Sequence, residues 1–147
     1  MSIWASQAKM ADSDHKRHRI LVIEPADADA SDDGSIASLV DTAGGGRWLI
    51  DRSRTADARD ALLKPKLHLI VIDEAAVAAS ERGWLLEQIR RHAPSAGVVY
   101  IALDHSPEVE RSVRARGVLH YTSRPIERER LVQLLRAFVE PAGSQPT

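Results

Sequence analysis

The sequence contains no cysteine and no excess of either charge, and these absences exclude several classes of function. Without cysteine the chain forms no disulfides, zinc–thiolate sites or thiol nucleophiles. Its 20 basic and 21 acidic residues leave no overall field to attract DNA or an anionic membrane. It has no apolar run near the roughly 20 residues of a membrane span, and no secretory h-region. We therefore expect a cytoplasmic protein with no nucleic-acid or membrane partner.

Three familiar kinds of site are also missing. The six histidines are scattered, and no two stand at metal-ligand spacing with a third partner. No Ser/His/Asp set presents a G-x-S-x-G elbow. The run Gly44–Gly46 follows a predicted helix, whereas a phosphate-binding loop follows a strand and opens a helix. The glycines therefore predict a helix end and not a nucleotide site.

What the sequence does contain is an alternation of apolar strands and amphipathic helices. Its centre is the stretch 67–74 (LHLIVIDE), an apolar, β-branched run that ends in two carboxylates and is typical of a parallel strand buried on both faces. Further strands are predicted at 20–23, 48–50, 98–103 and 118–122, each followed by a helical pattern. We expect one domain over 18–140, with a flexible leader at 1–17 and a disordered tail at 141–147.

Polar residues predict where several helices begin. Ser31, Asp32 or Asp33 is expected to cap the first helix, and Thr55 the second. Ser106 followed by a proline is a good start for the fourth helix.

Five strands alternating with five helices predict an α/β fold with a doubly wound parallel sheet. Because crossovers are right-handed, few topologies remain, and we expect the flavodoxin-like (βα)5 order 2-1-3-4-5. In that order the carboxyl ends of strands one and three lie side by side. Glu24 and Asp73, which follow those strands, are therefore expected to lie close together at the edge where such sheets bind ligands.

From about Arg19 to Val139 the chain resembles the receiver domains of two-component response regulators, in an atypical form. The resemblance is carried by RILVIE at the first strand, LHLIVID at the third, the run GWLLEQIRR, Gly117 before the short fifth strand, and YTSRPI at the end of the pattern. It implies that Asp73 accepts a phosphoryl group from a histidine kinase or phosphotransfer protein. It also implies that Glu24 and Asp73 bind Mg²⁺.

Other positions of the receiver pattern are altered. Pro25 replaces the second acid, so Mg²⁺ binding is expected to be weak or absent. Arg124 stands where the family has a lysine, and we expect it to pair directly with Asp73. Tyr121 matches the family's aromatic switch, but Ala102 replaces the hydroxyl residue that couples phosphorylation to that switch. Glu24, if it binds no metal, is expected to be solvated or paired with Arg124.

Three functions remain open at this point. The first is a stand-alone receiver, not an enzyme, whose phosphorylation modulates contacts of the Ser106–Val139 face with a partner protein or a second copy. The second is a pseudo-receiver that serves as a constitutive interaction or dimerisation module without phosphorylation, which Pro25 and Ala102 favour. The third is a flavodoxin-like binding or catalytic domain unrelated to phosphorelays. It is disfavoured because the acidic stretch 24–33 suits anionic cofactors poorly.

Overall fold

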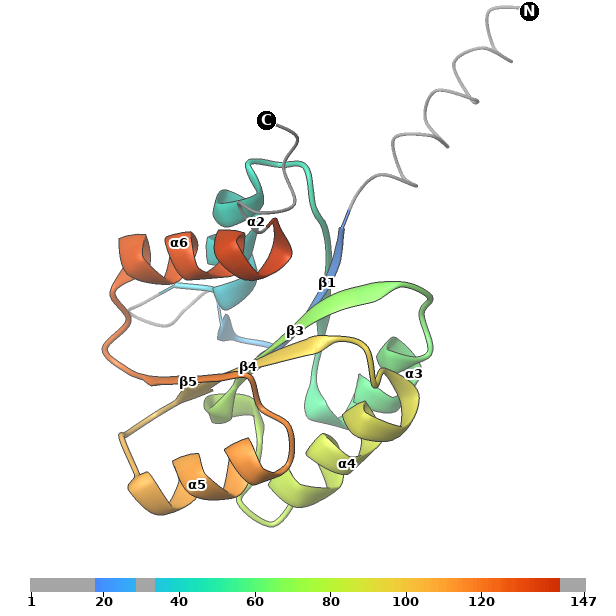
Figure 1. Cartoon of the computed structure of the whole chain (residues 1–147), viewed down its shortest axis with the longest axis vertical. Helices are drawn as coiled ribbons and strands as arrows, with labels where there is room; N and C mark the ends of the chain where they lie inside the picture. The colour runs from blue at the N-terminus through green and yellow to red at the C-terminus, as the bar shows by residue number, and fades with distance from the viewer. Residues whose placement is uncertain (1–17, 29–33, 141–147) are drawn as a thin grey trace, which may run out of the picture.

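The computed structural model describes residues 18–28 and 34–140 and confirms the predicted fold. Within that part of the chain a parallel sheet runs in the order β2-β1-β3-β4-β5 (Figure 1). Its strands are β1 (Arg19–Ile23), β2 (Leu49–Ser53), β3 (Leu67–Asp73), β4 (Gly97–Ala102) and β5 (His120–Ser123). The predicted leader 1–17 and tail 141–147 lie outside the described residues.

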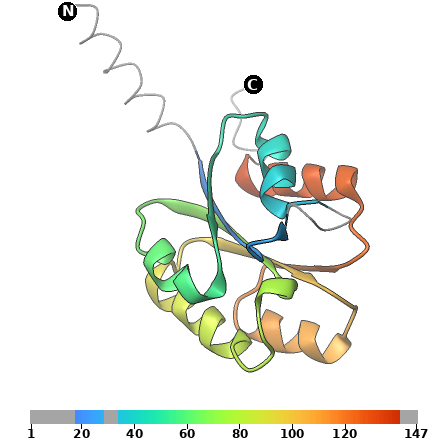
Figure 2. The same ribbon diagram turned by 180° about the vertical axis from the view of Figure 1, so that it is seen from behind.

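Helices cover both faces of the sheet, as Figures 1 and 2 show from opposite sides. One face carries α2 (Ile36–Gly44) and α6 (Arg128–Val139), and the other carries α3 (Ala58–Leu62), α4 (Arg82–His92) and α5 (Pro107–Ala115). Two short 3-10 turns, η2 (Thr55–Asp57) and η3 (Glu74–Ala76), lead into this second layer. None of the helices in the described ranges is long and apolar enough to cross a membrane.

The central strand β3 supplies side chains to the cores on both sides, as its composition predicts. Ile70 and Ile72 pack toward α3, α4 and α5, whereas Leu69 and Val71 pack toward α2 and α6. Because successive strand residues face opposite sides, a strand covered on both faces needs an unbroken apolar run. His68 is the exposed residue of this strand. Its ring packs edge to face against that of His18, with the ring centroids 4.9 Å apart.

The structure confirms one of the predicted helix-capping residues and contradicts another. Ser106 caps α5 as predicted, because its side chain accepts a hydrogen bond from the Val109 amide. The prediction for Thr55 was wrong: its hydroxyl donates to the Ala76 carbonyl at 2.8 Å and ties η2 to the turn after β3. The cap of α2 is Ser35, and the predicted residues 31–33 lie outside the described residues.

Strand β2 begins one residue later and runs further than predicted, because Trp48 turns into the core. The Trp48 side chain is buried, and a Cβ built on Gly44 would lie 2.5 Å from its ring. Only glycine leaves room for the indole at that point. The longer strand extends to Ser53 and brings Arg52 to the carboxyl edge of the sheet.

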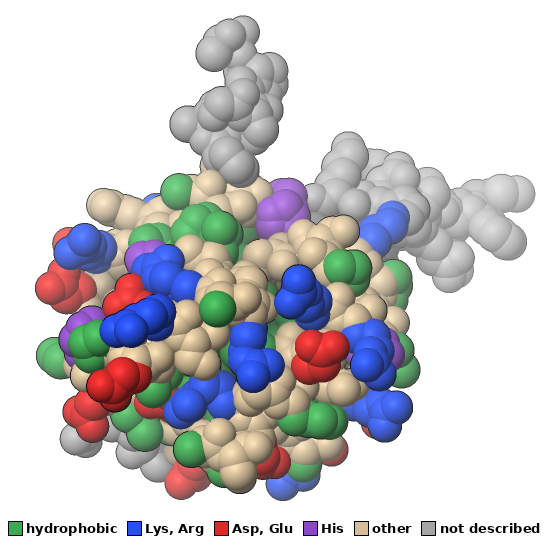
Figure 3. Space-filling view, turned by 60° about the horizontal axis from the view of Figure 1, so that its bottom comes forward, with side chains coloured by type: hydrophobic (Ala, Val, Ile, Leu, Met, Phe, Trp, Pro, Cys, Tyr) green, Lys and Arg blue, Asp and Glu red, His purple; other side chains and the backbone are tan. Residues whose placement is uncertain are grey.

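The outer surface of α4 and α5 is charged. Figure 3 shows Lys and Arg side chains interspersed with Asp and Glu on this side of the molecule. Two ion pairs form within these helices, between Arg114 and Glu110 at 2.9 Å and between Arg91 and Glu87 at 3.9 Å. Such exposed pairs stabilise a helix only slightly.

Candidate functional site at the carboxyl edge of the sheet

Three carboxylates gather where β1 and β3 end, and each has an arginine partner. Glu24 pairs with Arg52, Asp73 with Arg124, and Glu74 with Arg82. The three arginines come from β2, from the loop after β5 and from α4, so segments far apart in the sequence supply them. Each of these three carboxylates is therefore paired with a cation from the chain itself.

Asp73 and Arg124 form the ion pair that the sequence predicts. The Arg124 Nη2 atom donates to Asp73 Oδ2 at 2.8 Å, and the carboxylate side chain is only 3% exposed. The other oxygen, Oδ1, accepts from the Ala75 amide at 3.0 Å and thereby caps η3. Arg124 is placed by the sheet itself, because its amide continues the β4–β5 ladder by donating to the Ala102 carbonyl at 2.9 Å.

The prediction that Glu24 is solvated or paired with Arg124 was wrong, because Glu24 is buried and binds the start of α2 and Arg52. The residue is 2% exposed. Its Oε1 accepts from the Ser35 hydroxyl at 2.7 Å and pairs with Arg52 Nε at 2.9 Å. Its Oε2 accepts from the amides of Ile36 and Ala37 at 2.8 and 3.2 Å. A carboxylate at a helix N-terminus satisfies amides that have no partner in the helix and interacts favourably with the helix dipole.

These contacts decide whether the residues fit Mg²⁺, which needs several free oxygen ligands. Both oxygens of Glu24 are already bound by four donors. Both oxygens of Asp73 are bound by Arg124 and Ala75, and Pro25 offers no side-chain ligand. Within residues 18–28 and 34–140, no three His, Cys, Asp or Glu side chains are grouped to hold a metal ion. The described side chains at this edge therefore do not fit Mg²⁺.

Glu74 organises a polar cluster that sequence reasoning missed. Its Oε2 accepts from the Tyr100 hydroxyl at 2.5 Å and from Arg82 Nη2 at 3.3 Å. Arg82 Nε in turn donates to the Tyr100 hydroxyl at 2.8 Å, while the Leu103 amide donates to Glu74 Oε1 at 3.0 Å. Burial and the hydrogen bond to Glu74 raise the pKa of Tyr100 above its ordinary value. The available signal was a single tyrosine inside an otherwise aliphatic strand.

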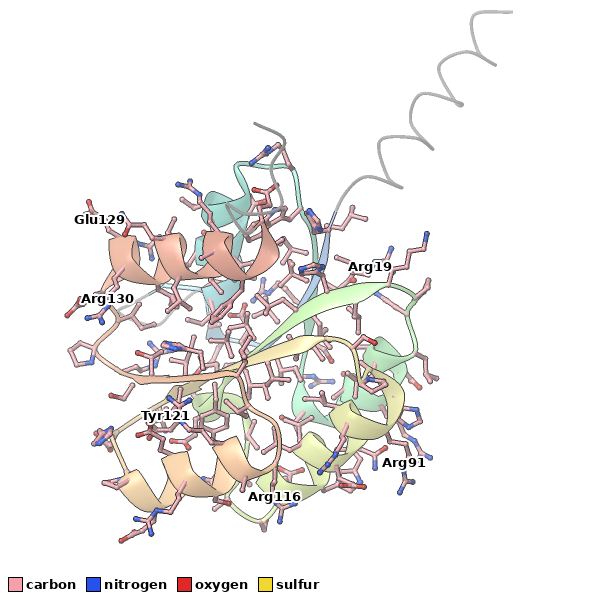
Figure 4. All side chains as sticks on the ribbon, in the orientation of Figure 1. Arg19, Arg91, Arg116, Tyr121, Glu129 and Arg130 are labelled. Atoms are coloured by element: carbon pink, nitrogen blue, oxygen red, sulfur yellow. The ribbon has the colours of Figure 1, made fainter. Side chains whose placement is uncertain are left out.

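Tyr121 is a buried residue of β5, and its side chain lies on the face of the sheet that α5 covers (Figure 4). Its ring stacks on Tyr100 with centroids 6.0 Å apart and planes 6° from parallel. Its hydroxyl accepts from the Ser106 amide at 3.0 Å, which joins β5 to the start of α5. Ala102 is fully buried next to this pair and has no hydroxyl to offer it.

Comparison with known proteins identifies the fold. No protein-family model matches the chain, and no curated protein matches it. Among solved structures, a response regulator receiver domain protein from Methanospirillum hungatei superposes with a TM-score of 0.68, at 14% identity over 85% of this chain and 95% of that chain. The chain has the receiver fold of response regulators. At this identity the likeness establishes the fold alone.

Two further solved structures that superpose on this chain are described as pilus assembly proteins and not as response regulators. A protein from Burkholderia pseudomallei described as pilus assembly-related has a TM-score of 0.64 and 23% identity, over 85% of this chain and 90% of that one. A protein from Burkholderia thailandensis with a similar description has a TM-score of 0.65 and 22% identity, over 83% and 97%. The receiver fold is therefore found both in response regulators and in proteins described as serving pilus assembly.

Proposed function

We propose that this chain is a receiver-fold interaction module that binds its partner without phosphorylation of Asp73. The observation that carries the proposal is the ion pair between Arg124 and Asp73, which holds the matched phosphoacceptor at 2.8 Å in a buried position. Phosphoryl transfer to a carboxylate depends on cations that neutralise the charge building on the phosphoryl oxygens. Here the arginine is already paired with the acceptor.

The contacts of Glu24 support the same proposal. A receiver that uses Mg²⁺ needs the acid at the end of β1 to face the acceptor. In this chain that acid accepts four hydrogen bonds or ion-pair contacts from α2 and Arg52. Releasing it would leave two amides at the start of α2 without their acceptor and would break the ion pair with Arg52. Metal binding would have to offset that cost in free energy.

A partner surface is available on the face from Ser106 to Val139. A groove of about 240 Å³ lies along β5 and the start of α6. Tyr121, Ile126, Leu131 and Leu134 contribute apolar surface to the groove, and Glu127 and Arg130 lie at its rim. The lining mixes apolar side chains with polar and charged ones, as the surfaces of protein–protein contacts do. We propose that this groove receives a partner protein or a second copy of the chain.

Phosphorylation of Asp73 by a histidine kinase or phosphotransfer protein is the second candidate function. It is favoured by the position of Asp73 at the end of β3, where the receiver pattern has its phosphoacceptor. In that case binding at the Ser106–Val139 face would depend on the phosphoryl group. The two candidates differ in a single observable, the covalent state of Asp73.

The deciding experiment is to incubate the purified protein with a small phosphodonor and Mg²⁺ and to read its intact mass, with Asp73→Asn as the matched control. We expect no added mass in either protein. Addition of one phosphoryl group that is lost in Asp73→Asn would overturn the proposal and establish the phosphorylated receiver.

The partner surface is tested separately by charge reversal. Arg130→Glu changes an exposed residue at the rim of the groove, and Arg90→Glu changes an exposed residue on α4 away from it. We expect Arg130→Glu to weaken self-association, measured by sedimentation, or binding to a captured partner. Arg90→Glu should leave both unchanged. The pilus assembly description of two similar structures makes pilus assembly proteins the first class of partner to screen.

A further inference from the structure

The loop between β4 and α5, residues 103–106, is hydrogen-bonded at one end to the partly buried Glu74 and at the other to the buried Tyr121. At one end the Leu103 amide donates to Glu74 Oε1 at 3.0 Å. At the other end the Ser106 amide donates to the Tyr121 hydroxyl at 3.0 Å. This loop begins the Ser106–Val139 face, so its conformation sets the position of the first residues of that face.

Tyr100 connects these two ties. Its hydroxyl donates to Glu74 at 2.5 Å, and its ring stacks on Tyr121 at 6.0 Å. The two tyrosines lie opposite each other in the register of β4 and β5. A single buried side chain is therefore in contact with both of the residues that hold the loop.

Tyrosine is suited to this position because its hydroxyl both donates and accepts a hydrogen bond here. It donates to the Glu74 carboxylate and accepts from Arg82 Nε at 2.8 Å. Hydrogen bonds that involve a charged partner are stronger than neutral ones. Tyr100 is fully buried, so turning its ring away would leave the carboxylate and the guanidinium underpaired and would remove the stack on Tyr121.

We propose that Tyr100 is a positioning residue that couples the acidic end of β3 to Tyr121 and the start of α5. It thereby holds residues 103–106 in one arrangement without a phosphoryl group. The coupling that a hydroxyl at position 102 would provide is replaced by a hydroxyl two residues earlier on the same strand. This inference rests on the proposed function in that it explains how an unphosphorylated chain presents a fixed partner face.

The test is amide hydrogen exchange on the full, unphosphorylated chain. Tyr100→Phe removes the hydroxyl and keeps the ring. We expect the amides of Leu103 and Ser106 to exchange about tenfold faster, as expected for the loss of a hydrogen bond to a charged group. The Ile23 amide in β1 reports on global stability and should change much less. Glu74→Gln removes the negative charge that Tyr100, Arg82 and the Leu103 amide all bind, and it should accelerate exchange of the same two amides.

Two matched variants separate coupling from a local role. Tyr121→Phe removes the hydroxyl that holds Ser106 and should accelerate Ser106 but not Leu103. Asp51→Asn weakens ion pairs on β2, away from residues 103–106, and should leave both amides unchanged.

Three results would overturn the inference: unchanged Leu103 and Ser106 exchange in Tyr100→Phe, acceleration only in proportion to Ile23, or an equal effect of Asp51→Asn. A phosphoryl adduct in the mass experiment would overturn the proposed function instead, because the exchange data come from protein that has met no phosphodonor.

Discussion

Arg124 and Asp73 are 51 residues apart in the sequence, yet their side chains meet at 2.8 Å at the carboxyl edge of the sheet. The carboxylate is nearly buried and the guanidinium is 16% exposed, so little water screens the pair. An arginine of the chain itself is thus bound to one oxygen of the Asp73 carboxylate. The first prediction follows from this geometry.

Removing the arginine alone should destabilise the fold more than removing both partners. Arg124→Ala leaves the Asp73 carboxylate buried without its cation, which we expect to cost about 3 kcal/mol of unfolding free energy. In the double variant Arg124→Ala/Asp73→Asn no unpaired charge remains, and at least about 1 kcal/mol should be recovered. Urea unfolding of the wild type, both single variants and the double variant measures this coupling. Additive single effects would contradict it.

The contacts of Glu24 predict a structural role that does not depend on Mg²⁺. Glu24→Gln replaces a buried acceptor of four contacts with an amide that places a donor against other donors. We expect a loss of about 2–4 kcal/mol of unfolding free energy, because a buried charge network loses its centre. Added Mg²⁺ or a chelator should leave the melting temperature of the wild type unchanged. A rise in melting temperature with Mg²⁺ that disappears in Glu24→Gln would show a metal site instead.

The surroundings of His120 predict that the free energy of unfolding decreases in mildly acidic solution. Burial, followed by the nearby Arg114 and Arg130, lowers the pKa of His120 below its ordinary value, while Glu110 acts weakly in the opposite direction. The unfolded chain therefore binds a proton more readily than the folded chain as the pH falls through about 6.5, and the unfolding free energy decreases. Below the folded-state pKa the decrease stops.

The measurement is denaturant unfolding between pH 7.5 and 5.5. His120→Gln should flatten the decrease relative to the wild type. His105→Gln, a change at an exposed loop histidine, is the matched control for the substitution itself. A wild-type slope that is unchanged in His120→Gln would show that this histidine does not carry the effect.

The sequence predicts the sheet because burial of a strand is encoded locally. The apolar run ending at Asp73 and the shorter runs around it specify which segments lie inside, and the handedness of crossovers leaves few arrangements for them. Arg124 pairing with Asp73 was also predictable, because a buried carboxylate at a strand end favours a cation and the receiver pattern places one there.

The partners of Glu24, Glu74 and Tyr100 were not predictable in the same way. The donors to these acids come from other segments of the chain. Arg52 lies beside Glu24 because β2 extends to Ser53. Tyr100 and Glu74 are hydrogen-bonded although they are 26 residues apart in the sequence. From the sequence alone, several arginine, hydroxyl or backbone amide donors were equally plausible partners for each acid. Only the tertiary structure decides among them, because hydrogen bonds and ion pairs depend on distances of a few tenths of an ångström between atoms on different elements. The sequence by itself determined the fold and the place of the acidic edge, and the packing of side chains decided what each acid binds.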